Sequence, residues 1–302
     1  MSTIENRYDF VFLFDCQDGN PNGDPDSDNS PRFDPETFQG LVSDVCLKRK
    51  IRDYVYYAQP SNGNAGGNGY EIFVLSGNTL ESRQRLPFEQ LSGTEKIEPK
   101  GKDTKATDIE KARQWMCGHF FDVRAFGAVM STTEFNCGQV RGPLQLTFGR
   151  SVDRVLPTEH TISRQAFTGE KDSKSGTGTL GRKHTIPYGL YVAHGYVNPF
   201  FAAKTGFDTA DLELVRKALA SLFDLDRSAA RGNMSVRGLY VFKHECKLGN
   251  APAQSLFDKV AIKRRDGVES PRSYADYEVT PPDPASLPTG ITFVDGLRES
   301  FA

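Results

Sequence analysis

Residues 8–14 read Tyr-Asp-Phe-Val-Phe-Leu-Phe, a run rich in aromatic residues. Such a run is typical of a buried β-strand. Residues 15–25 follow directly and read Asp-Cys-Gln-Asp-Gly-Asn-Pro-Asn-Gly-Asp-Pro. Their Asp-Gly, Asn-Gly and Asp-Pro pairs predict a long ordered loop, neither strand nor helix. We therefore expect a core strand that ends in a polar loop.

A helix is predicted next, because Ser43 or Asp44 can cap its N-terminus and Pro60 can end it. Apolar and basic residues recur on two different sides of this helix. The apolar side holds Leu47, Ile51, Val55 and Ala58, and the basic side holds Lys48, Arg49 and Arg52.

Further elements complete an α+β pattern of the order βαββαβ, which predicts a ferredoxin-like or RRM-like core with two large insertions. The insertions are residues 58–115, which include a glycine-rich stretch, and the polar residues 160–186. The remaining predicted elements are strands at Arg124–Met130, Pro143–Phe148, Tyr188–Val197 and Val236–Phe242, and a helix that starts between Asp208 and Asp211.

Charge is unevenly distributed along the 302 residues, although the net charge is only −2. Residues 1–45 hold ten acidic and two basic side chains, a net of −8. Residues 46–60, 141–184 and 227–247 carry net charges of +3, +4 and +4. A chain with separate acidic and basic regions can bind a polyanion on one face, or pair head to tail with its own copies. Ordinary variation in surface charge is the alternative.

The composition favours a cytoplasmic protein without membrane contact. Five cysteines form no CxxC pair and are odd in number, which indicates reduced thiols. The longest aliphatic and aromatic run, residues 10–14, is far shorter than the roughly 20 residues of a membrane span. Charged residues precede that run, so it is not a secretory signal.

Two polar features are candidates for nucleic-acid contact. Asn20 and Asn22 can donate to phosphates or base edges, and a cap at Ser43 would place free helix amides beside the glycine-containing loop. The basic side of that helix can follow phosphates, or can simply be a solvated surface. The insertion 160–186 combines cations with one aromatic ring, which suits binding of a single-stranded nucleic acid. The alternative is a disordered surface loop. The candidate residues are Arg164, Phe167, Arg182 and Lys183.

Catalysis has little support in the sequence. The five histidines show no HExxH spacing, the cysteines lack metal-ligand spacing, and no nucleophile elbow or Walker loop is present. Asp15 and Asp18 could hold magnesium for phosphodiester cleavage, but a capping or turn-forming carboxylate is the commoner role. We expect no catalytic residue, no metal and no cofactor.

Several long motifs resemble the CRISPR backbone proteins of subtype I-C, the Csd-type members of the Cas-seven family. The resemblance covers most of residues 7–245 and is weakest at 61–69 and after 249. It rests on residues 8–25, 41–52, 122–130, 141–143 and 181–191, which include Asp-Val-Arg-Ala-Phe-Gly-Ala-Val-Met and Gly-Arg-Lys-His-Thr-Ile-Pro-Tyr-Gly-Leu-Tyr.

The resemblance implies a hand-shaped subunit whose copies stack along one CRISPR RNA and present it for pairing with target DNA. Each thumb would reach over the neighbouring palm and displace a guide nucleotide at intervals. The implied parts are an RRM-like palm (1–57, 116–159 and 187–248), inserted fingers (58–115), a thumb hairpin (160–186) and a C-terminal wrapping segment (249–302).

The resemblance also implies a non-catalytic, RNA-binding role in the type I-C Cascade complex. Its partners would be CRISPR RNA, target DNA, further copies of the chain and the Cas-five, Cas-eight and small-subunit types. Type III relatives cut RNA with a backbone aspartate, so a metal-dependent endoribonuclease is the alternative. The RNA-binding residues would be Asn20, Asn22, Gly23, Ser43, Lys48, Arg49, Arg52, Gln139, Arg141, Arg164, Phe167, Arg182, Lys183, Arg231 and Arg237.

Overall fold

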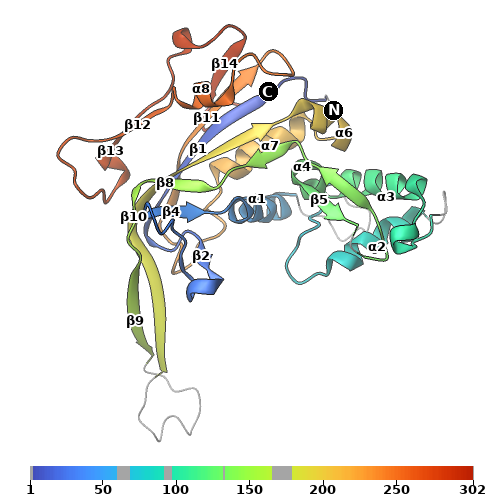
Figure 1. Cartoon of the computed structure of the whole chain (residues 1–302), viewed down its shortest axis with the longest axis horizontal. Helices are drawn as coiled ribbons and strands as arrows, with labels where there is room; N and C mark the ends of the chain where they lie inside the picture. The colour runs from blue at the N-terminus through green and yellow to red at the C-terminus, as the bar shows by residue number, and fades with distance from the viewer. Residues whose placement is uncertain (1–2, 60–68, 92–96, 132, 165–178, 302) are drawn as a thin grey trace, which may run out of the picture.

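A computed structural model describes residues 3–59, 69–91, 97–131, 133–164 and 179–301. Its central element is an eight-stranded sheet of order β14-β11-β1-β10-β8-β4, in which β7 and β9 also pair with β10. The chain is therefore a mixed α+β protein (Figure 1). The strands of this sheet are β1 (Tyr8–Gly19), β4 (Gln39–Val42), β7 (Leu144–Leu146), β8 (Gly149–Arg154), β9 (Thr158–Arg164), β10 (Thr179–Val197), β11 (Met234–His244) and β14 (Ile291–Asp295).

The predicted first strand is present and continues to Gly19, so the prediction of a loop from residue 15 is wrong. The cause is pairing on both sides. β1 runs antiparallel to β10 as far as Gly19 opposite Ile186, and to β11 as far as Cys16 opposite Met234. These neighbours satisfy the backbone groups that the turn-forming residues would otherwise leave free. The polar loop begins only after Gly19, with the short strands β2 (Gly23–Asp24) and β3 (Ser30–Pro31).

Helices cover one face of the sheet. The alternate residues Phe10, Phe12 and Phe14 are fully buried against α1 (Asp44–Ala58) and α7 (Thr209–Ala220). The cap predicted at Ser43 is confirmed, since its Oγ accepts from the amide of Cys46 at 3.2 Å. Of the predicted apolar stripe, Ala58 is exposed, whereas Leu47, Ile51 and Val55 are buried. None of the described helices is long and apolar enough to cross a bilayer.

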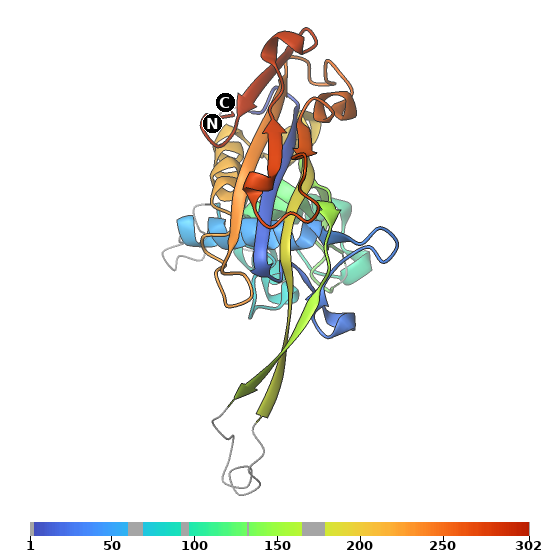
Figure 2. The same ribbon diagram turned by 90° about the vertical axis from the view of Figure 1, so that its left-hand side faces the viewer.

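The C-terminal residues cover much of the opposite face. Val11 and Leu13 of β1 pack against Leu256 and Phe257 of α8 (Ala253–Phe257). A two-stranded ribbon, formed by β12 (Ala261–Arg264) and β13 (Tyr277–Thr280), lies across the sheet beside it (Figure 2). Both faces of the central strand are thus buried, which explains its unbroken apolar run at residues 10–14.

A second apolar cluster lies beside the first and belongs to the long insertion. It extends beyond residue 115, because Met116, Val123 and Cys137 are part of it. The strand predicted at Arg124–Met130 is wrong in its first half, since Arg124, Ala125 and Phe126 end a helix. The elements are α2 (Leu80–Gln90), α3 (Ala106–His119), α4 (Phe121–Phe126), β5 (Gly127–Met130) and β6 (Gly138–Arg141), followed after β10 by α6 (Pro199–Thr205).

Two buried charges in α4 connect this insertion to the helices on the sheet. Arg124 donates from Nε and Nη2 to both carboxylate oxygens of Asp211, at 2.8 and 2.7 Å. Asp122 accepts from Arg52 Nε at 2.7 Å and from the amides of residues 73 and 74. In a strand, residues 122 and 124 would point to the same face, whereas in a helix they point in different directions. The helix therefore lets Asp122 reach α1 and Arg124 reach α7.

Strands β9 and β10 form a hairpin that projects from the sheet (Figures 1 and 2). Their pairing runs from Thr158 opposite Thr185 to Arg164 opposite Thr179. The strand predicted at Tyr188–Val197 is therefore only the inner half of β10. Phe167 and the hairpin tip lie outside the described residues.

We expect Arg124→Ala to lower the free energy of unfolding by about 3–5 kcal/mol, because Asp211 would be left buried without its partner. Urea denaturation followed by circular dichroism measures this effect. Arg227→Ala is the matched control: its pair with Asp224 is exposed, with side chains 59% and 62% accessible. That control should cost less than about 1 kcal/mol. Equal losses in the two variants would contradict a role for burial.

Candidate nucleic-acid interface

The loop after β1 is fastened to the start of α1 by the predicted asparagines. Asn22 Oδ1 accepts from both the amide and the hydroxyl of Ser43, each at 2.9 Å. Asn20 Nδ2 donates to the carbonyl oxygen of Asn29 at 2.7 Å. A Cβ atom at Gly23 would collide with the Asn29 side chain, so a larger residue here requires that side chain to move. Asn20, Asn22, Gly23 and Ser43 thus come together, and they have structural partners there.

Two of the predicted cations on α1 are already paired within the chain. Lys48 Nζ lies 2.9 Å from Asp44 Oδ2, one turn earlier in the helix. Arg52 is only 13% exposed and pairs with the buried Asp122. Arg52 therefore connects α1 to the insertion. Its guanidinium is not exposed, so the structure gives no support to the prediction that Arg52 contacts RNA.

A cluster of cations surrounds Asp226 beside the middle of α1. Lys50 is fully buried and pairs with this carboxylate, while Arg49 and Arg231 approach it at 3.2 and 3.1 Å. Burial would raise the pKa of Asp226, but the Lys50 hydrogen bond and the surrounding cations outweigh it and lower the pKa. Three cations around one carboxylate leave positive charge here, even though Arg49 also binds Asp53. Sequence reasoning missed Lys50, although it lies three residues after the buried Leu47.

The base of the hairpin reaches this same region. Lys183 Nζ donates to the carbonyl oxygen of Ala229 at 2.6 Å. The backbone amide of Asn20 donates to the carbonyl oxygen of Ala230 at 2.7 Å. Arg182 is 65% exposed and has Glu159 at 3.2 Å. The structure therefore brings together the loop after β1, the start of α1, the segment before β11 and the hairpin. Arg164 lies on β9, further along the hairpin.

Three predicted residues lie elsewhere. Gln139 and Arg141 are on β6 in the insertion, where the Arg141 guanidinium stacks 4.5 Å from the Phe201 ring centroid. Arg237 projects from the sheet face that the C-terminal segment covers. Its Nε donates to Asp15 at 2.8 Å. The structure thus does not place these residues at the hairpin base with the others.

Asp15 was the candidate metal ligand of the endoribonuclease alternative. It is 3% exposed and accepts from both Arg237 and the hydroxyl of Tyr188, the latter at 2.9 Å. Burial raises the pKa of Tyr188, with the nearby Asp15 carboxylate adding to the effect. Asp18 is exposed at the end of β1. Among the described residues no group of three or more histidine, cysteine, aspartate or glutamate side chains could hold a metal ion.

The sequence matches the family described as "CRISPR-associated protein Cas7" over residues 6–281, and the chain belongs to this family. The CRISPR-associated protein Cas7 of Haloferax volcanii is 27% identical over 231 residues, which cover 70% of this chain and 62% of that protein. The chain thus spans less than two thirds of that relative's length.

Two solved structures are also similar. A chain of a "CRISPR RNA-guided surveillance complex, pre-nicking" aligns with a TM-score of 0.49 and 15% identity, covering 78% of each chain. A chain of a "CRISPR RNA-guided surveillance complex" aligns with a TM-score of 0.40 and 14% identity, covering 77% of this chain and 68% of the other.

Asn22 allows structural and RNA-binding roles to be separated. Asn22→Ala removes the acceptor of two hydrogen bonds from Ser43, and we expect it to lower the free energy of unfolding by about 1–3 kcal/mol. Asn22→Asp keeps that acceptor and adds a negative charge at a helix N-terminus, so stability should be retained. Thermal melting measures both. A loss of RNA binding in the stable Asn22→Asp variant would indicate that the RNA phosphates lie close to residue 22, and equal melting of all three proteins would contradict the structural role.

Proposed function

We propose that this chain is the non-catalytic, RNA-binding backbone subunit of a type I-C Cascade surveillance complex. Membership of the Cas7 family supports the class of protein. The observation that carries the proposal is the convergence of the hairpin base, the loop after β1 and the cation cluster around Asp226. A cationic surface beside a projecting hairpin suits a single-stranded nucleic acid.

An RRM-like palm is part of the proposal. It is supported by the strand order β11-β1-β10-β8, with β7 also beside β10, and by α1 and α7 on one face. In this arrangement the antiparallel partners of β1 come late in the chain, as a βαββαβ core requires. The insertion with its own apolar cluster would be the fingers, and the hairpin β9–β10 would be the thumb.

We place the guide RNA along the base of the hairpin. Arg182 and Arg49 are exposed enough to meet phosphates, at 65% and 49%, and Arg231 shares Asp226 with Arg49. Asn20 Oδ1 is buried and has no hydrogen-bond partner among the described residues. A 2′-hydroxyl or a base amino group could donate to it only if the loop after β1 moved aside.

The partners in this proposal are CRISPR RNA, target DNA through guide pairing, further copies of the chain and the Cas-five, Cas-eight and small-subunit types. Separate acidic and basic regions support contact between copies. A cytoplasmic location is supported by the five cysteines, none of which forms a disulfide.

Expression with and without a CRISPR array tests the proposal. We expect large particles that protect guide-length RNA only when the array is present, as measured by size-exclusion chromatography and RNA sequencing. The same RNA should stay intact when labelled and incubated with the protein and Mg²⁺. Nucleic-acid-free protein under both conditions would contradict RNA binding, and cleavage that EDTA abolishes would favour the endoribonuclease alternative.

Lys48→Ala combined with Arg49→Ala should weaken guide binding. If each cation neutralises one phosphate, the slope of log K against log salt should fall by about 1.4. Fluorescence anisotropy at several salt concentrations measures this slope. Arg298→Ala is the control, because Arg298 is 84% exposed and follows shortly after β14, a strand that lies far from the hairpin in Figure 1. Unchanged affinity and slope in the double variant would show that these cations serve only their internal ion pairs.

A further inference from the structure

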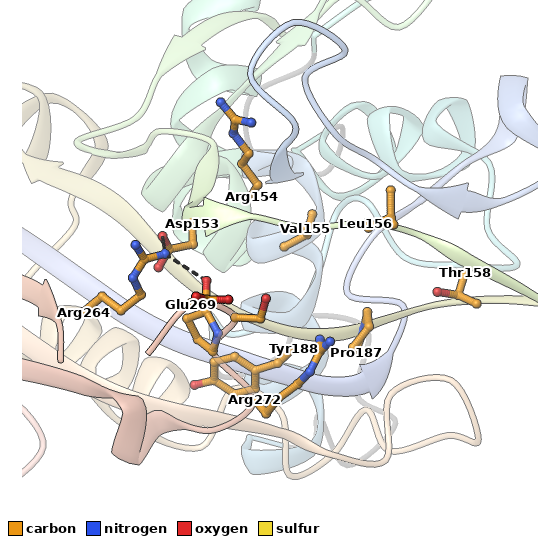
Figure 3. Close-up of a pocket in the computed structure, with 12 residues that line it drawn as sticks. Asp153, Arg154, Val155, Leu156, Thr158, Pro187, Tyr188, Arg264, Glu269 and Arg272 are labelled. Carbon is orange, nitrogen blue, oxygen red and sulfur yellow. Dashed lines mark hydrogen bonds and ion pairs between the residues drawn. The ribbon is translucent and has the colours of Figure 1, made fainter. Parts of the chain in front are cut away.

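A pocket of about 560 Å³ lies between the end of β8, the inner part of β10 and the segment that joins β12 to β13 (Figure 3). Arg264 at its wall pairs with Asp153 at 3.2 Å, and Figure 3 shows Arg154 directed away from the other side chains. Arg272 and Glu269 remain, with opposite charges. The charges that line this pocket thus balance one another and do not indicate a ligand.

The Asn22–Gly23 pair, in the loop after β1, combines the groups needed for a covalent change. The side-chain amide of an asparagine can be attacked by the backbone nitrogen of the next residue, and glycine has no Cβ to hinder that attack. Asn22 Nδ2 donates to the carbonyl oxygen of Gly23 at 3.3 Å, so the Asn22 side chain already lies against the following residue. The electrophile and the nucleophile are therefore neighbours in the folded chain.

The backbone nitrogen of Gly23 is not used by the neighbouring strand β3. Gly23 stands opposite Pro31, and the amide of Arg32 donates to the carbonyl oxygen of Asn22 at 3.0 Å. Hydrogen-bonded and non-hydrogen-bonded pairs alternate along an antiparallel ladder, so Gly23 and Pro31 form a pair without direct hydrogen bonds. Gly23 is also only half-buried, so hydroxide from the solvent can approach its amide.

The amide oxygen of Asn22 faces two hydrogen-bond donors. Its Oδ1 accepts from the amide and from the hydroxyl of Ser43, each at 2.9 Å. Ser43 Oγ itself accepts from the amide of Cys46 at 3.2 Å, which directs the hydroxyl proton toward Asn22. Negative charge develops on Oδ1 when a nucleophile adds to the amide carbon, and two fixed donors stabilise such charge as an oxyanion hole does. The positive end of α1 acts in the same direction.

We propose that Asn22 is a deamidation site in the folded protein and that Ser43 promotes the reaction. Hydroxide takes the proton of the Gly23 amide, and that nitrogen forms a bond to Cγ of Asn22. The bond from Cγ to Nδ2 then breaks, and the nitrogen leaves as ammonia after taking a proton from water. Water opens the resulting succinimide ring at either carbonyl, which gives aspartate or isoaspartate. Nothing is oxidised or reduced.

The modification changes the candidate interface in two ways. It places a carboxylate beside the start of α1, and the isoaspartate product adds one carbon to the backbone where β2 begins. A negative charge at this position repels RNA phosphates. This consequence for guide binding rests on the proposed function, whereas the reaction at Asn22 does not.

Peptide mass spectrometry tests the reaction. Full-length wild type, Ser43→Ala and Ser43→Thr are incubated at mildly alkaline pH in water enriched in heavy oxygen, and the tryptic peptide 8–32 is analysed over time. We expect wild type and Ser43→Thr to acquire an acid with one heavy oxygen at residue 22. Ser43→Ala should react about tenfold more slowly, a smaller factor than the loss of one oxyanion donor causes in an enzyme. In urea all three proteins should react at the same rate.

The direction of the Ser43→Ala effect separates promotion from simple restraint. Loss of the cap destabilises the start of α1, so a variant in which Asn22 is merely less restrained would deamidate faster than wild type. An equal or faster rate in folded Ser43→Ala would therefore overturn the proposal. No deamidation at Asn22 in wild type would overturn it too, as would a rate difference that persists in urea.

A second measurement connects the reaction to guide binding. Anion-exchange chromatography separates the modified protein, which carries one more negative charge, from the unmodified protein. We expect the modified fraction to bind guide RNA more weakly in fluorescence anisotropy. Equal affinity of the two fractions would overturn the proposed position of the guide beside Asn22 and leave the deamidation site standing.

Discussion

Helix α1 is held by ion pairs on two sides, and the arrangement of the candidate interface depends on this. Arg52 pairs with Asp122 of the insertion, and Lys50 pairs with Asp226 beside the hairpin base. These charges are largely removed from water. Removing one partner therefore costs much more free energy of folding than breaking a surface ion pair would. The helix therefore fixes the insertion and the hairpin base relative to one another, and the Arg124 pair with α7 adds a third attachment.

The parts of the fold that follow local rules could be predicted from the sequence. The aromatic run of β1, the Ser43 cap and the Asp208 capping box of α7 are local signals, and all three are present. The extension of β1 to Gly19 depends on strands far along the chain, which overrule the turn-forming residues. Helix α4 was missed for a similar reason, because its polar residues are stabilised by partners in α1 and α7.

The candidate site shows the same limit. The sequence located the polar loop, the start of α1 and the hairpin, and the structure brings them together. It could not show which cations are free, because the acids that pair with Arg52 and Lys50 are far away in the sequence, at Asp122 and Asp226. It also could not separate Gln139 and Arg141 from the hairpin, since that requires knowing where the insertion packs. Lys50 was missed although helical periodicity carries the signal, since it lies three residues after the buried Leu47.

The central position of β1 has a consequence for how the chain folds. Tyr8 pairs with Val197 on one side and Lys243 on the other, so the first strand must wait for partners from the second half of the chain. Its apolar second face is covered only when α8 has been synthesised. Such non-local pairing slows folding and leaves the aromatic strand exposed on the nascent chain. The N-terminal strand is thus a segment that chaperones would need to protect during translation.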